Sequence, residues 1–448
     1  MAQFSIVKKS ELEGAMRLDA EYYQPKYLEM VRVLKQQPVV ANVGSLCKQI
    51  YRYPTFYNLV YQDDGVLVLK GEDINPHGVI NNVRGDHISI ETSKNFPKTI
   101  LKNHDLILSV RGYVGKVGLV NSQYEGAIIS PNLIKLAVDS SRISPVYLWV
   151  FLNSRYGNLQ LARAKMQTSQ ETIVSSDIKN ILVPLPNLRF QSEIENIVEI
   201  VTKQDLLSKS LYLQAEQLLL DEVGFKDLDL SHQLCYTVPF KKTEEANRLD
   251  AEHFQPKYGR LVEFIKRRKH TTLGGLGKVL RGKNPSRYVE EGIPVIRAID
   301  LRNVLDTSAF LRCPPEKGLF YLRHGDILIS SIGWGSIGKV TTFVHPERMI
   351  TVSEVSVIRQ TEMLPFALQI FLQSSLGQLQ LERKITGSTG QLHLYPRDIE
   401  TVVVPCLAHP LQQRIADLVA QSWEARQKAR QLLEEAKRKV EDLVEGRG

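Results

Sequence analysis

Cysteine is scarce in this chain of 448 residues. The four that are present, Cys47, Cys235, Cys313 and Cys406, lie far apart and form no CxxC pair. Their scarcity excludes a mini-protein built on disulfides, argues against a zinc site and is typical of the reducing cytosol. The ten His residues form no HxxxH or HExxH cluster, so we predict no metal site.

Long apolar runs are also missing. No stretch approaches the roughly 18 uninterrupted apolar residues that a membrane helix needs. Residues 1–14 lack an apolar core of signal-peptide length, and we therefore predict a cytoplasmic protein with no membrane partner. The composition, 43% hydrophobic and 24% charged, excludes a largely disordered chain. The net charge of +8 permits nucleic acid as a partner but decides nothing by itself.

Catalytic motifs are absent as well. Gly333-Trp-Gly-Ser-Ile-Gly338-Lys339 fits the GxxxxGK pattern of a phosphate loop, but Val340 stands where a magnesium-binding Ser or Thr is needed, and a strand is predicted to follow. The nearest matches to an amino-methyltransferase motif begin at Asn75 and Asn284 and are ordinary turn sequences. Glu382-Arg-Lys384 has the spacing of a nuclease motif, yet that spacing is common on solvated helix faces. We predict no catalytic residue and a protein that is not itself an enzyme.

What the sequence does contain is a duplication. Arg17-Leu-Asp-Ala-Glu21 returns as Arg248-Leu-Asp-Ala-Glu252, and Asp105-Leu-Ile-Leu-Ser109 returns as Asp326-Ile-Leu-Ile-Ser330. Further matched pairs follow in the same order: Gln24-Pro-Lys-Tyr27 with Gln255-Pro-Lys-Tyr258, Gly115-Lys-Val117 with Gly338-Lys-Val340, Val183-Pro184 with Val404-Pro405, and Gln191 with Gln412. The lag stays between about 220 and 231 residues. Two copies are too few for a solenoid, so the repeat predicts a pseudo-twofold molecule.

Each copy begins with a β-rich part, roughly 40–185 and 271–405. Short β-branched runs between Gly, Pro, Asn and Asp are typical of strands, and we predict them at Val66–Leu69, Leu106–Val110, Val117–Val120, Ile327–Ile329 and Thr401–Val404. Helices are predicted to begin at Pro145 and Pro365. The fold class is therefore α+β.

Each copy then ends in a long helix with apolar residues at 3-4 spacing, the pattern of a coiled-coil seam. The predicted seam is Ile194, Ile197, Val201, Leu211 and Leu218 in the first helix and Ile415, Leu418, Leu432 and Leu443 in the second. Small residues at Ser422, Ala425, Ala429 and Ala436 allow a close approach. We predict that the two helices, rods of roughly 45 Å, pair as an antiparallel coiled coil; the alternative is that each only covers its own domain. The predicted division is 1–190, 191–224, 225–410 and 411–448.

The candidate binding residues lie on loops of the β-rich parts. Arg111, Tyr113 and Lys116 in the first copy, with Trp334 and Lys339 in the second, combine cation, aromatic ring and glycine after a strand, as contacts to phosphates and bases require. The alternative is an ordinary hairpin with an exposed Lys.

Two further sets of polar and basic residues complete the candidates. Amides and hydroxyls suited to base edges lie on a second matched loop: Gln167, Ser169, Ser388, Thr389, Gln391 and the neighbouring His393. Arg281 and Lys283 form a basic strand end where the first copy has Tyr51-Arg-Tyr53. Lys70 and Arg297 end matched runs, and either contact phosphate or form ion pairs with Asp73 and Asp300.

The whole pattern resembles the specificity (S) subunit of Type I restriction–modification enzymes. The resemblance covers essentially the entire chain and rests on the order and duplication of motifs that are individually unspecific. These are the β-rich domain followed by a long helix, the Asp-Ile-Leu-Ile-Ser segment with its glycine loop, Ser130-Pro-Asn132, and Val183-Pro-Leu-Pro186 leading through Gln191 into a helix, repeated from Val404 to Ile415.

The resemblance implies a non-catalytic subunit whose two target recognition domains each read one half of a bipartite site in double-stranded DNA, about one helical turn apart. It implies no cofactor in this chain. S-adenosylmethionine would bind two methyltransferase (M) subunits, and ATP and Mg would bind restriction (R) subunits. Matched residues would position the protein on phosphates, and unmatched ones would select bases.

One segment departs from this symmetry. The first copy lacks the Gly282-Lys-Asn-Pro285 stretch of the second, which leaves Tyr51–Thr55 without an assigned role at the DNA. The rival interpretation of the whole chain is a pseudo-dimeric scaffold that binds protein or carbohydrate. A solitary enzyme with an unrecognised site is disfavoured by duplication with divergent loops.

Overall fold

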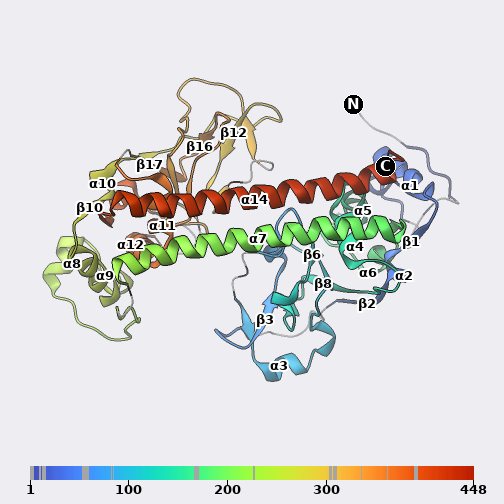
Figure 1. Cartoon of the computed structure of the whole chain (residues 1–448), viewed down its shortest axis with the longest axis horizontal. Helices are drawn as coiled ribbons and strands as arrows, with labels where there is room; N and C mark the ends of the chain where they lie inside the picture. The colour runs from blue at the N-terminus through green and yellow to red at the C-terminus, as the bar shows by residue number, and fades with distance from the viewer. Residues whose placement is uncertain are drawn as a thin grey trace. The chain divides into compact units, whose positions relative to one another are not determined.

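The chain forms two compact units, Met1–Gln204 with Lys428–Gly448, and Asp205–Gln427. The computed structural model (Figure 1) describes residues 5–9, 12, 17–52, 60–81, 83, 85–165, 171–225, 228–301, 305, 310–333, 335–360, 362–387 and 392–447. Each long helix is shared between the units, so these divisions fall within the helices. The division into 1–190, 191–224, 225–410 and 411–448 stays a prediction.

The first unit is built from short strands and helices. In chain order they are η2 (Ala20–Tyr23), α1 (Pro25–Lys35), β1 (Val40–Asn42), α2 (Val43–Leu46), β2 (Cys47–Arg52), β3 (Val66–Leu69), η3 (Gly71–Asp73), β4 (His87–Ile88), α3 (Ile90–Lys94), η4 (Pro97–Thr99), β5 (Leu106–Ser109), β6 (Val117–Leu119), η5 (Ser122–Tyr124), β7 (Ile128–Ile129), β8 (Leu133–Val138), α4 (Pro145–Asn153), α5 (Arg155–Ala164), α6 (Ser175–Lys179), β9 (Leu182–Pro184) and the first part of α7 (Leu188–Val223).

The second unit repeats this order. Its elements are α8 (Phe240–Ala246), η6 (Glu252–Phe254), α9 (Pro256–Lys266), β10 (His270–Thr272), α10 (Leu273–Leu276), β11 (Gly277–Arg281), β12 (Ile293–Ile296), η7 (Ala298–Asp300), β13 (Leu311–Cys313), β14 (Ile327–Ser330), β15 (Val340–Thr342), β16 (Ile350–Thr351), β17 (Val355–Gln360), α11 (Pro365–Gln373), α12 (Ser375–Lys384), α13 (Pro396–Ile399), β18 (Val403–Pro405) and the first part of α14 (His409–Val444).

Both units have the same sheets. A four-stranded antiparallel sheet has the order β2-β8-β5-β6 in the first unit and β11-β17-β14-β15 in the second. A three-stranded sheet, β4-β3-β7 or β13-β12-β16, contains one parallel pair, and β1-β9 or β10-β18 form a two-stranded ribbon. Strands β5 and β14 are wholly buried, which explains their unbroken apolar sequence.

The repeated Asp of the Asp-Ile-Leu-Ile-Ser segment forms a buried ion pair in each unit. Asp105 lies 3.1 Å from Lys135 of β8, and both side chains are under 10% exposed. Asp326 pairs with Arg359 of β17 at 2.6 Å. Because a buried carboxylate needs a partner, each copy supplies a cation from its central strand, although at different positions.

The repeated glutamines connect each long helix to its own unit. Gln191 accepts from the Ser144 N–H at 2.8 Å and donates to the Pro186 carbonyl at 2.9 Å. Gln412 makes the corresponding bonds to Leu364 and Leu407, at 2.9 and 2.8 Å. This matched pair therefore has a structural role.

The two long helices pack together within each unit. In the first unit, Ile194, Val198 and Val201 of α7 share a core with Ala429, Leu433, Ala436, Val440 and Val444 of α14, and Lys439 pairs with Glu193 at 2.7 Å. In the second unit, Ala215, Leu219 and Val223 share a core with Leu411, Ile415 and Val419, and the Oγ atoms of Ser208 and Ser422 lie 3.0 Å apart. Early residues of α7 thus meet late residues of α14, and late ones meet early ones, as in an antiparallel coiled coil (Figure 1).

At several positions of the coiled-coil seam, the buried residue lies one position later in the sequence than predicted. Ile194, Val201, Leu211 and Ile415 are buried. The other five seam candidates, Ile197, Leu218, Leu418, Leu432 and Leu443, are half-buried, and the residue after each of them is buried. Where two apolar residues are adjacent, a helix separates them by about 100°, and only one faces the partner.

The secondary structure agrees closely with the sequence patterns. The strands predicted near Val66, Leu106, Val117, Ile327 and Thr401 are confirmed as β3, β5, β6, β14 and β18, and α4 and α11 begin at the predicted prolines. Helix α7 begins at Leu188 because the Asn187 side chain caps the Phe190 N–H at 2.9 Å. It ends at Gly224, whose positive φ of 64° suits glycine.

Candidate nucleic-acid interface

Strand register gathers the candidate loops at one end of each four-stranded sheet. In the second unit, Arg281 ends β11 opposite Ser356, and Ser330 ends β14 opposite Val355, the first residue of β17. The segments that follow Arg281 and Ser330 and the one that precedes Val355 therefore leave the same edge, which we call the loop end.

The loop end of the first unit is built in the same way. Arg52 ends β2 opposite Ile134, and Ser109 ends β5 opposite Leu133, where β8 begins. Counting along the registers, Arg52 occupies the position of Arg281. The sequence comparison places Tyr51-Arg-Tyr53 where the second copy has its basic strand end, but Arg52 is not among the predicted binding residues.

In each unit, two loops meet at this loop end. One is the hairpin loop that follows β5 or β14, and the other is the loop that follows α5 or α12. In the second unit, the Leu394 N–H donates to the Ser331 carbonyl at 2.9 Å, and His393 forms bridges with both Ile332 and Thr386. In the first unit, the Ile173 N–H donates to the Val110 carbonyl at 3.4 Å. The segment ending at His393 therefore lies against the hairpin loop that leads to Lys339.

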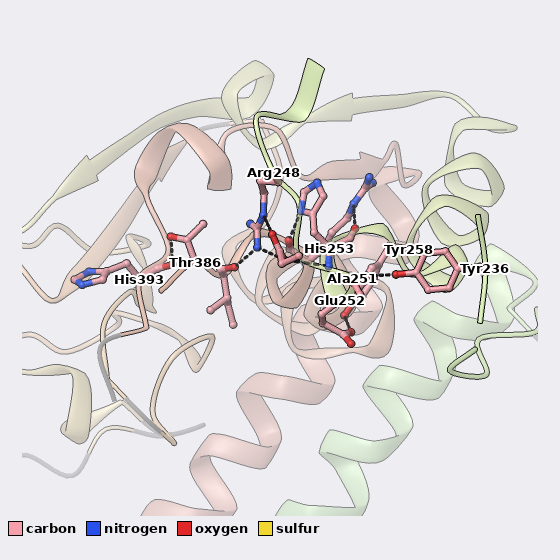
Figure 2. Close-up of polar contacts among 11 residues, drawn as sticks. Tyr236, Arg248, Ala251, Glu252, His253, Tyr258, Thr386 and His393 are labelled. Carbon is pink, nitrogen blue, oxygen red and sulfur yellow. Dashed lines mark hydrogen bonds and ion pairs between the residues drawn. The ribbon is translucent and has the colours of Figure 1, made fainter. Parts of the chain in front are cut away.

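In the second unit, the Arg-Leu-Asp-Ala-Glu repeat anchors the base of the loop that follows α12 (Figure 2). Arg248 binds Asp250 with two nitrogens, at 2.7 and 2.6 Å, and also donates to the Ile385 carbonyl at 2.9 Å, one residue before Thr386. Thr386 and His393 exchange two backbone hydrogen bonds of 2.9 and 2.8 Å, which close the loop between them.

The same anchor exists in the first unit. Arg17 binds Asp19 with two nitrogens, at 2.9 and 2.6 Å, and donates to the Lys165 carbonyl at 3.4 Å. The hydrogen bond to Asp19 raises the pKa of Arg17, and the bond from Arg17 lowers the pKa of Asp19. The arginines of this motif are thus engaged in contacts within the chain that fix the loop.

The basic residues at the strand ends of the three-stranded sheets form ion pairs. Arg297 binds Asp300 with two nitrogens, at 3.0 and 3.1 Å, as one of the two alternatives predicted. Lys70 pairs at 2.7 Å with Asp86 and not with Asp73, whose carboxylate instead accepts the Lys70 backbone N–H at 2.7 Å. Burial lowers the pKa of Lys70, but the bond to Asp86 and other acidic neighbours raise it, and the net shift is upward.

The candidate residues on the hairpin loop of the first unit differ in their exposure to solvent. Arg111 and Tyr113 are exposed, and the Tyr113 ring is 54% accessible. Lys116 is half-buried, since its Nζ donates to the Ile74 carbonyl at 2.6 Å and lies 4.4 Å from the centre of the Tyr113 ring. In the second unit, Lys339 is exposed.

The basic strand end of the second unit is also exposed. Arg281 donates through Nε to the Ser353 carbonyl at 2.8 Å, and the residue is exposed. Lys283 is exposed two residues further on. His393 is half-buried and stacks on Tyr395, with ring centres 5.8 Å apart. Six predicted residues, Gln167, Ser169, Trp334, Ser388, Thr389 and Gln391, lie outside the described residues.

Part of this chain is similar in sequence to known proteins. A family model described as the Type I restriction modification DNA specificity domain matches residues 61–217. The specificity subunit of the Type I restriction enzyme EcoBI from Escherichia coli is 26% identical over 137 residues, which are 30% of this chain and 28% of that subunit. The MjaVIII specificity subunit from Methanocaldococcus jannaschii is 27% identical over 146 residues, 30% of this chain and 34% of that subunit. Residues 61–217 are therefore similar to the DNA specificity domain of Type I restriction–modification systems.

Solved structures of specificity subunits are also similar to this chain. The S subunit from M. genitalium is 16% identical, with 91% of this chain and 94% of that one covered and a TM-score of 0.39. The HsdS subunit from Thermoanaerobacter tengcongensis is 19% identical, with 92% and 96% covered and a TM-score of 0.29. The aligned parts of the two curated subunits are less than two thirds of their lengths.

Among the residues that the structure describes, no helix is both long and apolar enough to span a membrane. No group of three or more His, Cys, Asp or Glu residues in the same part of the chain is arranged to hold a metal ion.

Proposed function

We propose that this chain selects the DNA sequence for a Type I restriction–modification complex. Each unit reads one half of a bipartite site in double-stranded DNA through the loop end of its four-stranded sheet. The paired helices set the distance between the half-sites and dock the methyltransferase subunits. The observation that carries this proposal is that each unit gathers two divergent loops and exposed cations at one sheet end, on a frame that is the same in both units.

The division between frame and loops supports a role in reading two different half-sites. The buried ion pairs of Asp105 and Asp326, and the bonds of Gln191 and Gln412, recur in both units. At the loop ends the residues differ, with Arg111 in the position of Ile332. Sequence is read by contacts to base edges, whereas phosphate contacts fix position, and a shared frame with different loops meets both needs.

The surface of α7 supports the docking of partner subunits. Leu206 is 53% and Leu213 is 64% exposed, and they lie seven residues apart on one face of the helix. Large exposed apolar side chains that recur along one helix face are available to a protein partner. The partners bring the chemistry: S-adenosylmethionine on two methyltransferase subunits, and ATP and Mg on restriction subunits.

The test is reconstitution with the methyltransferase encoded beside this chain, followed by mapping of methylated adenines in genomic DNA. We expect one bipartite, asymmetric motif with a spacer of fixed length. A complex that assembles but methylates no defined motif would contradict the proposal. Copurification of this chain with a carbohydrate or an unrelated protein, without methylation, would favour a scaffold.

A further inference from the structure

The loop end of the first unit holds an arginine whose side chain is incompletely bonded. Arg52 is half-buried, and its Nε and Nη2 are inaccessible to solvent and make no hydrogen bond to the described chain. A buried donor without an acceptor costs roughly 1–3 kcal/mol, and more when it is charged. The native fold tolerates this cost at a position where a strand ends.

A second arginine, Arg111, adds positive charge close enough to Arg52 to affect its pKa. Burial lowers the pKa of Arg52, and the positive charge of Arg111 lowers it further. Arg111 is exposed on the neighbouring hairpin loop. Two like charges brought together repel each other, and a bound anion would remove that repulsion.

Hydroxyl donors at the same loop end are also unsatisfied. The Oγ of Ser130 and the Oγ1 of Thr172 are buried and have no partner in the described chain. Ser130 lies three residues before Leu133 of β8 and donates its N–H to the Leu69 carbonyl at 2.9 Å. Thr172 precedes Ile173, whose N–H is bonded to Val110. Both hydroxyls thus belong to segments that meet the hairpin loop of Arg111.

The second unit does not repeat this arrangement. Arg281 holds the register position of Arg52, but its Nε is satisfied by the Ser353 carbonyl. The position of Arg111 is taken by the neutral Ile332. The incompletely bonded guanidinium is therefore a property of the first unit and not of the shared frame.

We propose that Arg52 and Arg111 form a phosphate-binding site in the first unit, which clamps one phosphodiester of the DNA backbone. The inference rests on the proposed function and names a contact within it. A phosphate offers several acceptor oxygens and a negative charge, so it satisfies the guanidinium donors and removes the repulsion together. The Ser130 and Thr172 hydroxyls are the neighbouring neutral donors.

The experiment compares Arg52→Met with two matched variants of the full chain. Arg281→Met changes the residue at the same register position, and Arg32→Met removes one charge from α1, where Arg32 is exposed and paired with Glu29. Thermal unfolding is measured without DNA and with inorganic phosphate. Binding to a mixed-sequence DNA duplex is measured against salt concentration, for the chain alone and assembled with its methyltransferase. Arg52→Lys keeps the positive charge but lacks the planar guanidinium, so it tests whether charge alone is sufficient for phosphate binding.

Removal of Arg52 should have opposite effects on stability and on binding. Arg52→Met should raise the Tm of the DNA-free chain, weaken duplex binding about tenfold and lower the salt slope by about 0.9. Arg281→Met should also weaken binding but should not raise the Tm, and Arg32→Met should leave binding unchanged. Phosphate should raise the Tm of the wild type and not that of Arg52→Met.

The failure of this inference is distinguishable from failure of the proposed function. If the wild type binds duplex DNA while Arg52→Met lowers the Tm and keeps the wild-type salt slope, the phosphate site is wrong and the DNA-reading function stands. If the wild type binds no DNA but phosphate stabilises it through Arg52, the anion site stands and the DNA function is contradicted.

Discussion

Arg248 donates a hydrogen bond of 2.9 Å to the main-chain carbonyl of Ile385, at the base of the loop that returns to His393. Arg17 does the same for Lys165 in the other unit, at 3.4 Å. The most clearly repeated motif of the sequence thus fixes the loops that differ between the copies. If these loops read bases, as we propose, they need a rigid base, and the hydrogen bonds of this motif supply it.

Arg248→Gln should loosen that loop and reduce the stability of its unit. The variant loses the two bonds to Asp250 as well as the bond to Ile385, so we expect a loss of about 2 kcal/mol in the free energy of unfolding. The reconstituted methyltransferase should show relaxed selectivity at one half of its motif. Arg17→Gln is the matched control and should relax the other half. An unchanged Tm together with an unchanged motif would contradict the anchoring role.

Lys339 and Lys116 should differ although they are matched in sequence. Lys339 is exposed, and Lys339→Ala should weaken binding to all sequences alike, lower the salt slope by about 0.9 and lower the Tm less than a change at the half-buried Lys116. Lys116 is bound to the Ile74 carbonyl, so Lys116→Ala should lower the Tm as well as the salt slope. Equal Tm values for the two variants would show that the Lys116 contact is unimportant.

The exposed leucines of α7 should be needed for assembly. Leu206→Lys with Leu213→Lys should abolish copurification with the methyltransferase, because charge at an apolar contact is costly to bury. The fold should persist, since both side chains are already exposed. Leu234→Lys, at a residue that is 94% exposed and outside the helices, is the control. Retention of the methyltransferase by the double variant would place its docking surface elsewhere.

The contact between His77 and Glu434 should make the first unit sensitive to acid. Glu434 on α14 lies 3.4 Å from His77, and this hydrogen bond, together with Lys437, lowers the pKa of Glu434 to about 2. Because the folded pKa is below the ordinary value, the contribution to stability is complete above about pH 4.5 and is lost as the pH falls toward 2. Glu434→Gln should lower the Tm at pH 7 and reduce its fall between pH 5 and 2, as followed by circular dichroism. A variant whose Tm parallels that of the wild type at every pH would exclude this contact as a source of stability.

The sequence predicted the architecture more fully than the binding residues. Periodicity and the Val-Pro junctions located the strands and both long helices, because these patterns are local. Burial on the seam was missed by one residue at Ile197 and Leu218, where two adjacent apolar residues satisfy the same spacing. Only the packing of the partner helix decides between them.

The roles of individual arginines depended on three-dimensional neighbours. Arg52 escaped notice because its equivalence with Arg281 lies in strand register and not in the surrounding letters. Arg17 and Arg248 were visible as repeats, but their contacts join residues more than 130 positions apart. The duplication drew attention to Arg17 and Arg248, and their contacts show that both are hydrogen-bonded within the chain.

The central claim is that each unit reads one half of the site, and methylation mapping of a His393→Ala complex tests it most directly. His393 lies at the loop end of the second unit only. The account predicts that the methylated motif changes in one half, while the other half and the spacer length remain as in the wild type. A motif altered in both halves, or one unchanged at every position, would contradict it.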